Sequence, residues 1–256
     1  MNYIDAIILS VVEGITEFLP VSSTGHLILF SNLLNLPQTE FLKSFEIAIQ
    51  LGAILSVVVL YGRKLLSDTK LIKQTLIAFV PTGIFGLLLY KLVKDYLLGN
   101  AIVTVAALFL GGIGIIAAEY YFKNKKHGVE VNELGIKETL LIGVAQSVSM
   151  IPGVSRSAAT IIGGLFLGLN RKAAVEFSFI LAIPTMFAAT AYDLLKSAQT
   201  FNVSDFQTLA VGFVVSFIVA LMAVKWFVGF VKTKTLIPFA IYRIIISLVF
   251  GFIFLI

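Results

Sequence analysis

Cysteine is absent from the 256-residue chain, and only 13% of its residues carry a formal charge. Without cysteine, the protein can form no disulfide and offers no thiolate ligand to a metal. A soluble domain has about a quarter of its residues charged, whereas this chain is 59% hydrophobic. With a mean hydropathy of +1.01, the composition indicates a polytopic membrane protein with little mass outside the bilayer.

The net charge of +5 does not indicate nucleic-acid binding, because the basic residues occupy short loops between apolar runs. In such loops they act first as topology signals, and contacts with lipid headgroups are a second role. The N-terminus lacks a basic segment, and the apolar run that follows carries Glu13, so we expect no cleaved signal peptide. The partner that the composition predicts is the lipid bilayer.

Six apolar segments come close to the roughly 20 residues that cross a bilayer of about 30 Å. They are residues 45–62, 74–93, 101–122, 175–195, 207–231 and 236–256. Four shorter apolar segments form two pairs, 4–19 with 26–36 and 135–151 with 158–169. A turn of Pro, Ser and Gly divides each pair, and a polar turn at membrane depth is tolerated only where it lines a cavity inside the protein. We therefore interpret both pairs as re-entrant helix–turn–helix elements.

The order of these elements repeats, which predicts an all-α membrane domain of about ten helices built from repeats over about 1–125 and 130–256. A re-entrant pair returns to its own side and three spans cross an odd number of times. The second repeat must therefore be inverted relative to the first. With the N-terminus outside, thirteen basic residues fall in inner loops and four in outer segments. This asymmetry predicts that both termini lie outside.

The first polar cluster lies in the turn of the first pair. It combines two carboxylates, three hydroxyls and an imidazole: Glu13, Glu17, Ser22, Ser23, Thr24 and His26. Glu13 and Glu17 are four residues apart and share a helix face, Pro20 ends that helix, and the hydroxyl residues cap the next. A helix N-terminus beside hydroxyls is a natural phosphate site, and such a cluster in a membrane is costly unless it has a function. A solvated amphipathic helix followed by an ordinary turn is disfavoured, because the other face of this helix is too apolar.

The second polar cluster lies in the turn of the second pair and contains Ser155, Arg156, Ser157 and Thr160. Pro152 and Gly153 break the preceding helix, and Ser155 can cap the next one. The guanidinium of Arg156 suits bidentate phosphate binding. The alternative, that Arg156 extends to the interface, is weakened by the depth of the short helix. Acids on one turn and arginine on the other suit a phosphate substrate with a divalent cation.

Other charged residues leave alternatives open. Glu46 either completes the polar cavity or makes a structural hydrogen bond, and its repeat counterpart Glu176 has the same two alternatives. Glu119 precedes a lysine by one helical turn, which predicts an ion pair between them. Asp193 and Arg243 are either buried partners of each other or interfacial residues.

The two clusters resemble the signature motifs of the undecaprenyl-diphosphate phosphatases, a bacterial family also called bacitracin-resistance proteins. The matching segments are EGITEFLPVSSTGH over 13–26 and PGVSRSAAT over 152–160. The likeness continues around Glu46, Glu176 and Arg243 and so covers nearly the whole chain. It implies hydrolysis of a C55 isoprenoid diphosphate at the outer face of the bacterial plasma membrane, which recycles the carrier lipid for peptidoglycan. It also implies dependence on a divalent cation, Mg²⁺ or Ca²⁺.

With these motifs in place, we predict a role for each polar side chain. Glu13 and Glu17 would hold the cation, and Ser23 would be the nucleophile or would orient an attacking water. His26 would be the general base and later the acid. The predicted catalytic residues are Glu17, Ser23, His26 and Arg156, and the predicted substrate-binding residues are Ser22, Thr24, Ser155, Arg156, Ser157 and Thr160. Without the resemblance, a secondary transporter or lipid flippase would fit the repeats equally well. The oligomeric state stays open, with a homodimer possible.

Overall fold

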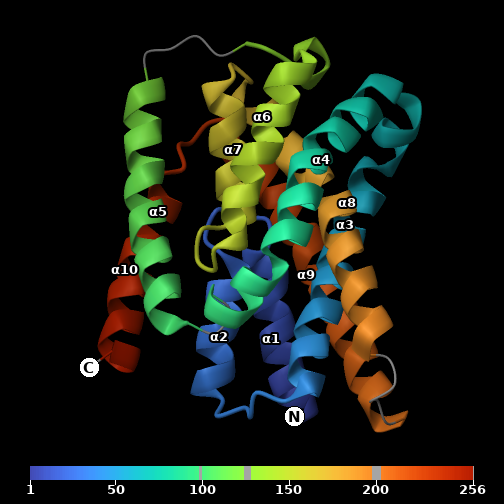
Figure 1. Ribbon diagram of the computed structural model, residues 1–256, viewed down its shortest axis with the longest axis vertical. Coiled ribbons are helices and arrows are strands. Elements are labelled where there is room, and N and C mark those ends of the chain that lie inside the picture. The colour runs from blue at the N-terminus through green and yellow to red at the C-terminus, as the bar shows by residue number, and fades with distance from the viewer. Residues whose placement is uncertain (98–99, 124–127, 198–202, 256) are drawn as a thin grey trace.

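The computed structural model describes residues 1–97, 100–123, 128–197 and 203–255 of the chain (Figure 1). In these ranges the secondary structure is helical apart from one isolated bridge between Val129 and Leu169. The α-helices are α1 (Tyr3–Thr16), α2 (Ser23–Leu33), α3 (Glu40–Ser67), α4 (Thr69–Leu92), α5 (Ala101–Phe122), α6 (Ile136–Ser147), α7 (Arg156–Phe166), α8 (Arg171–Ser197), α9 (Val203–Val231) and α10 (Ile237–Leu255). Two short helices followed by three long ones occur twice along the chain.

The long helices have the length and composition of membrane spans. Five of them are long and apolar enough to cross a bilayer, namely α3, α4, α5, α8 and α9, and α10 is a shorter apolar helix. Large apolar side chains such as Leu87, Leu88 and Phe252 lie exposed on these helices. Exposed apolar surface of this extent is stable only against lipid, so the predicted multi-pass membrane protein is confirmed.

The two short-helix pairs are hairpins that enter from opposite ends of the molecule (Figure 1). The α1–α2 hairpin starts at the end that carries both termini, the α6–α7 hairpin starts at the other end, and their turns meet near mid-height. A hydrogen bond of 2.8 Å from Ser157 Oγ to the carbonyl oxygen of Leu19 joins the two turns directly. The hairpins therefore share one central region.

Each hairpin packs against a long helix of the other half of the chain. Helix α1 packs on α9, and α6 packs on α4. Both contacts are close at a glycine: a Cβ on Gly14 would lie 2.9 Å from the carbonyl oxygen of Ser216, and one on Gly143 would lie 2.0 Å from that of Ala78. Helices α5 and α10 also pair with each other. Because each half supplies the packing surface for the other, the two turns are held in a fixed relation.

The helix ends differ from the prediction around the first turn. Helix α1 ends at Thr16 and not at residue 19, and α2 begins at Ser23 and not at residue 26. Pro20 therefore lies within the turn and does not itself end the helix. Glu17 still has helical backbone angles and its amide bonds to the Glu13 carbonyl at 2.9 Å, so the predicted shared face of the two acids is confirmed.

Candidate active site

The two turns have the same unusual backbone conformation. Ser22 and Ser155, the residues that precede α2 and α7, have φ angles of 72° and 76°. Non-glycine residues rarely adopt this left-handed region, and the strain of about 1–3 kcal/mol must be held by surrounding contacts. Ser155 Oγ accepts a hydrogen bond from the amide of Ala158, which confirms the predicted cap. Ser22, from the stretch predicted to cap α2, occupies the N-cap position, but its side chain makes no such bond.

Arg243 on α10 holds both turns in place. Its side chain is fully buried, and its guanidinium donates to five carbonyl oxygens at 2.7–3.3 Å. These oxygens belong to Pro20 in the first turn, to Gly153 and Val154 in the second, and to Ala107 and Leu108 on α5. One cation thus replaces the water that would otherwise solvate these strained turns, and it fixes them relative to each other.

Glu17 connects a polar side chain of the first turn with one of the second turn. Its Oε2 accepts a hydrogen bond of 2.6 Å from Ser23 Oγ at the start of α2, and its Oε1 pairs with Arg156 Nη2 at 2.7 Å. All three side chains are buried or nearly so. The predicted combination of acid and hydroxyl from one turn with arginine from the other is therefore present in one hydrogen-bonded network.

The position of Arg156 excludes the interfacial alternative. Its side chain is only 10% exposed, and its guanidinium carbon lies 5.6 Å from the centre of the Phe18 ring. Nη1 donates to the carbonyl oxygen of Ser178 at 2.9 Å. The buried Nε has no partner among the described residues. Arg156 is thus fixed by protein contacts, while its Nε–H has no protein acceptor among the described residues and can donate to an anionic ligand.

Three predicted substrate-binding hydroxyls bond to protein. Ser155 Oγ lies 3.1 Å from Ser157 Oγ, and Thr160 Oγ1 lies 2.5 Å from Ser178 Oγ. Ser157, as noted, reaches the backbone of the first turn. Their observed role is to fasten the second turn to the first turn and to α8. Thr24 is half-buried in the first turn of α2.

His26 is not paired with Ser23. Its Nδ1 lies 2.8 Å from the carbonyl oxygen of Ser22, and its Nε2 lies 2.7 Å from the hydroxyl of Tyr242. Because a carbonyl oxygen only accepts, Nδ1 carries the proton, and Nε2 of the neutral ring accepts from Tyr242. The rings also stack with centroids 5.5 Å apart. The Ser23 proton therefore faces Glu17, and the predicted contact with the imidazole is absent.

Glu13 is the one residue of the acid pair without a protein donor. It is fully buried, and both carboxylate oxygens lack a hydrogen-bond partner among the described residues. The charges of Glu17 and Glu46 repel it, and the charge of Arg156 attracts it. A buried carboxylate with no donor is unstable unless a proton or a cation compensates its charge. The two alternatives given for Glu46 stay predictions.

The residues fit a divalent cation only together with ligands from outside the protein. No cluster of three or more Asp, Glu, His or Cys side chains in the described ranges is arranged to hold a metal. Mg²⁺ typically takes one or two carboxylates, with water and substrate phosphate completing its shell. The unpartnered oxygens of Glu13, with Glu17 beside them, match that donor set.

The remaining charged residues pair differently from the prediction or outside the site. Glu119 forms two bonds of 2.5 and 2.6 Å with Arg171, so the predicted pair with the lysine one turn later is wrong: the arginine fork engages both carboxylate oxygens. Glu176 pairs with two lysines of α3 and α8. The side chain of Asp193 lies outside the described residues.

Sequence reasoning missed two residues of the site, Tyr242 and the clamping role of Arg243. Both belong to the segment around 237–243 that carries part of the family likeness, and that likeness was the available signal. The five carbonyl partners of Arg243 come from three separate segments, so no local pattern reveals them.

Comparison with known proteins agrees with these observations. The model of the family described as bacitracin resistance protein BacA matches residues 6–249. The chain is 55% identical to the undecaprenyl-diphosphatase of Aquifex aeolicus and 55% identical to that of Sulfurihydrogenibium sp., each over 98% of both chains. It is 48% identical to the undecaprenyl-diphosphatase of Thermus thermophilus over 98% of this chain and 97% of the relative. This chain therefore belongs to the bacitracin resistance protein BacA family.

Proposed function

We propose that this protein is an integral-membrane phosphatase that hydrolyses undecaprenyl diphosphate to undecaprenyl phosphate and inorganic phosphate. Its similarity to proteins named undecaprenyl-diphosphatase over almost their full length supports this reaction. The observation that carries the proposal is the link from Ser23 through Glu17 to Arg156, which brings a hydroxyl, an acid and a phosphate-binding cation together. The enzyme would act in the bacterial plasma membrane and recycle the carrier lipid of the cell wall.

The charge of the diphosphate would be met by Arg156 and by the beginnings of α2 and α7. Phosphoryl transfer depends mainly on positioning and on charge stabilisation. The free Nε of Arg156 can donate to a phosphate oxygen without breaking the pair with Glu17. Ser178, Thr160 and Ser157 keep this side chain and its turn in place.

Ser23 is the nucleophile in this proposal. Its Oγ attacks the terminal phosphorus while Glu17 Oε2 takes its proton, and the bond from phosphorus to the bridging oxygen breaks. Glu17 gives this proton to the bridging oxygen as undecaprenyl phosphate leaves. Water then attacks the phosphorus bound to Ser23 and gives a proton to Glu17, which returns it to Ser23 Oγ as inorganic phosphate leaves. Glu17 takes the role of general base that the sequence suggested for His26, because Glu17 contacts the hydroxyl.

Glu13 and Glu17 would hold Mg²⁺ or Ca²⁺, which when bound supplies positive charge for the phosphate oxygens. Glu13 would offer both of its oxygens to the cation, since neither has a hydrogen-bond partner among the described residues. Glu17 would divide its two oxygens between Ser23 and Arg156 in the free enzyme.

We further infer six spans, with α10 as the sixth, arranged as an inverted repeat whose hairpins are re-entrant. Reciprocal packing of α1 on α9 and of α6 on α4 supports the repeat, and both termini lie at one end of the molecule (Figure 1). We place that end, and the opening of the active site, outside. Cysteines introduced at the exposed residues Gln38 and Ser67 test this, since no native thiol interferes. An impermeant reagent should label only Gln38→Cys from outside. Labelling of both variants from one side would contradict the topology.

Phosphate release from a lipid diphosphate by purified, detergent-solubilised protein tests the function. A phosphatase releases phosphate in detergent with added Mg²⁺ or Ca²⁺, whereas a transporter or flippase has no reaction to run without a membrane. Ser23→Ala is the matched control, because it removes the nucleophile and keeps the fold. No release by correctly folded wild-type protein at any cation concentration would overturn the proposal.

A further inference from the structure

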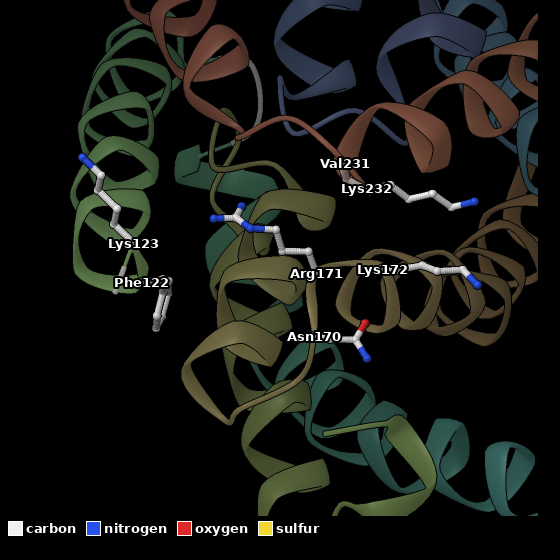
Figure 2. Close-up of a pocket in the computed structure, with 7 residues that line it drawn as sticks. All are labelled: Phe122, Lys123, Asn170, Arg171, Lys172, Val231 and Lys232. Carbon is white, nitrogen blue, oxygen red and sulfur yellow. The ribbon is translucent and has the colours of Figure 1, made fainter. Parts of the chain in front are cut away.

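A basic pocket lies at the end of the molecule opposite the termini. It is formed where α5 ends, where α8 begins and where α9 ends, and it has a volume of about 440 Å³. Its lining is shown in Figure 2 and consists of Phe122, Lys123, Asn170, Arg171, Lys172, Val231 and Lys232. Four of the seven lining residues are basic, and none is acidic.

An ion pair between Arg171 and the buried Glu119 forms one wall of this pocket. Arg171 donates two hydrogen bonds to Glu119, and the other contact of Glu119 is the backbone amide of Leu236 at 2.9 Å. This network ties α5, α8 and the start of α10 together. Because Glu119 compensates the charge of Arg171, the free positive charge of the pocket comes from its lysines.

The lysines are only partly compensated. Lys172 lies 3.6 Å from Glu176, but that carboxylate also binds Lys64 at 2.9 Å. No carboxylate of the described residues lies within salt-bridge distance of Lys123 or Lys232. Glu130 lies nearby but is bonded to the amide of Asn170 at 2.7 Å. Lys172 and Lys232 extend in the same direction, while Lys123 extends on the other side of Arg171 (Figure 2).

Aromatic side chains place the pocket at the level of lipid headgroups. Tyr121 and Phe166 are exposed and lie 5.5 Å apart between ring centroids, and on α9 the exposed Trp226 packs on Phe230. Tyrosine and tryptophan concentrate at the membrane–water interface. Basic pockets between helices at the cytoplasmic interface are suited to anionic headgroups.

We propose that this pocket binds a phosphate group, and that the source is an anionic phospholipid of the inner leaflet. The lysine ammonium groups would contact the phosphate oxygens. The site is separate from the Glu17–Arg156 network, so the proposal does not depend on the phosphatase reaction.

Lipid binding by the purified full-length protein tests the proposal. Native mass spectrometry compares retention of phosphatidylglycerol with that of phosphatidylcholine for wild type and for the double variant Lys172→Gln/Lys232→Gln. Each basic residue near an anionic lipid contributes about a fivefold change in affinity, so the double variant should lose roughly 25-fold in preference for phosphatidylglycerol. Lys70→Gln/Lys73→Gln is the matched control, because it removes the same charge from exposed positions outside the pocket.

A second measurement distinguishes the two sources of phosphate. Inorganic phosphate is added to each protein in phosphatidylcholine nanodiscs, and the melting temperature is recorded, which also verifies folding. A lipid preference lost only in the pocket variant supports the lipid as the ligand. Stabilisation by inorganic phosphate that only the pocket variant loses, without lipid preference, supports the pocket with free phosphate as its ligand. Equal losses in both double variants, or no discrimination in either measurement, would overturn the proposal.

Discussion

The turn between α1 and α2 and the turn between α6 and α7 share their backbone but differ in chemistry. Each contains a serine with a left-handed φ angle that precedes a short helix, Ser22 in one and Ser155 in the other. The next residue is Ser23 in the first turn and Arg156 in the second. Arg243 binds carbonyl oxygens of both turns. The scaffold is therefore duplicated, while the hydroxyl and the cation are divided between the copies.

The two hairpins also differ at a second pair of equivalent positions, on the first helix of each hairpin. Glu13 and Gln146 precede the two serines by the same number of residues, and both are fully buried. The amide nitrogen of Gln146 donates to Thr82 and Thr185 at 2.8 and 3.0 Å and only its oxygen lacks a partner, whereas both oxygens of Glu13 lack one in the described part of the chain. The two bonds of Gln146 fasten its hairpin to α4 and α8, while a buried carboxylate with no partner at all indicates a missing ligand. The comparison therefore assigns structure to the second hairpin's amide and ligand binding to the first hairpin's acid.

The largest effect is expected from Arg156→Lys, which removes the fork that only the second turn supplies. An ammonium keeps the charge but cannot contact Glu17, the Ser178 carbonyl and a phosphate together. We expect kcat/KM for the lipid diphosphate to fall at least about a hundredfold. Arg63→Lys, at an exposed position, is the control. Activity near that of the parent, with unchanged melting temperature, would show that the fork is not needed.

The guanidinium of Arg243, which binds both turns, can be displaced without mutating Arg243 itself. A Cβ on Gly111 would lie 2.0 Å from Arg243 Nη2, whereas a Cβ on Gly114 of the same helix would meet no atom within 4 Å. We expect Gly111→Ala to lower kcat roughly ten- to a hundredfold, because a shift of about 1 Å misplaces the reacting groups. Gly114→Ala should leave kcat unchanged. Equal kcat values for the two variants would mean that the guanidinium does not position the turns.

These contacts show what the sequence could and could not predict. The short pairs, the three long helices after each, and the Ser155 cap follow from segment length and from Pro, Ser and Gly in the turns. The motif residues Glu17, Ser23 and Arg156 were also identified, since acids and arginine in apolar segments are costly. Their pairing was not, because the choice of Glu17 over His26 as the partner of Ser23 depends on how the helices pack. The carbonyl partners of Arg243 were equally inaccessible, because they are brought together only by the tertiary fold.

Glu13, the acid that distinguishes the first hairpin, should affect how activity depends on the cation concentration. Glu13→Gln keeps the shape of the side chain and removes its charge, so the cation concentration needed for half-maximal activity should rise about tenfold or more. High Mg²⁺ or Ca²⁺ should partly restore the rate. Activity is titrated with cation at several pH values, with Glu40→Gln, an exposed acid, as the control. A loss that changes with pH but not with cation would instead indicate that Glu13 relays protons.

The smallest effect is expected at Tyr242, which belongs to neither turn. Tyr242→Phe removes the hydroxyl that bonds to Nε2 of His26 and should lower kcat about fivefold, the value of one hydrogen bond. Because His26 would lose its orientation, the pH–rate profile should also change. Tyr3→Phe removes a hydroxyl that bonds to Gln207 at 3.1 Å and is the matched control. An unchanged rate and pH profile in Tyr242→Phe would show that the orientation of His26 does not affect the reaction.

The central claim is that the two turns build one active site through the contact of Glu17 with Arg156. A double-mutant cycle on phosphate release tests it most directly, with wild type, Glu17→Gln, Arg156→Lys and the double variant measured at saturating cation. Residues that act as a unit give non-additive losses. The double variant should therefore be about as active as the worse single variant. If the two losses multiply instead, Glu17 and Arg156 act independently and the account of a single shared site is wrong.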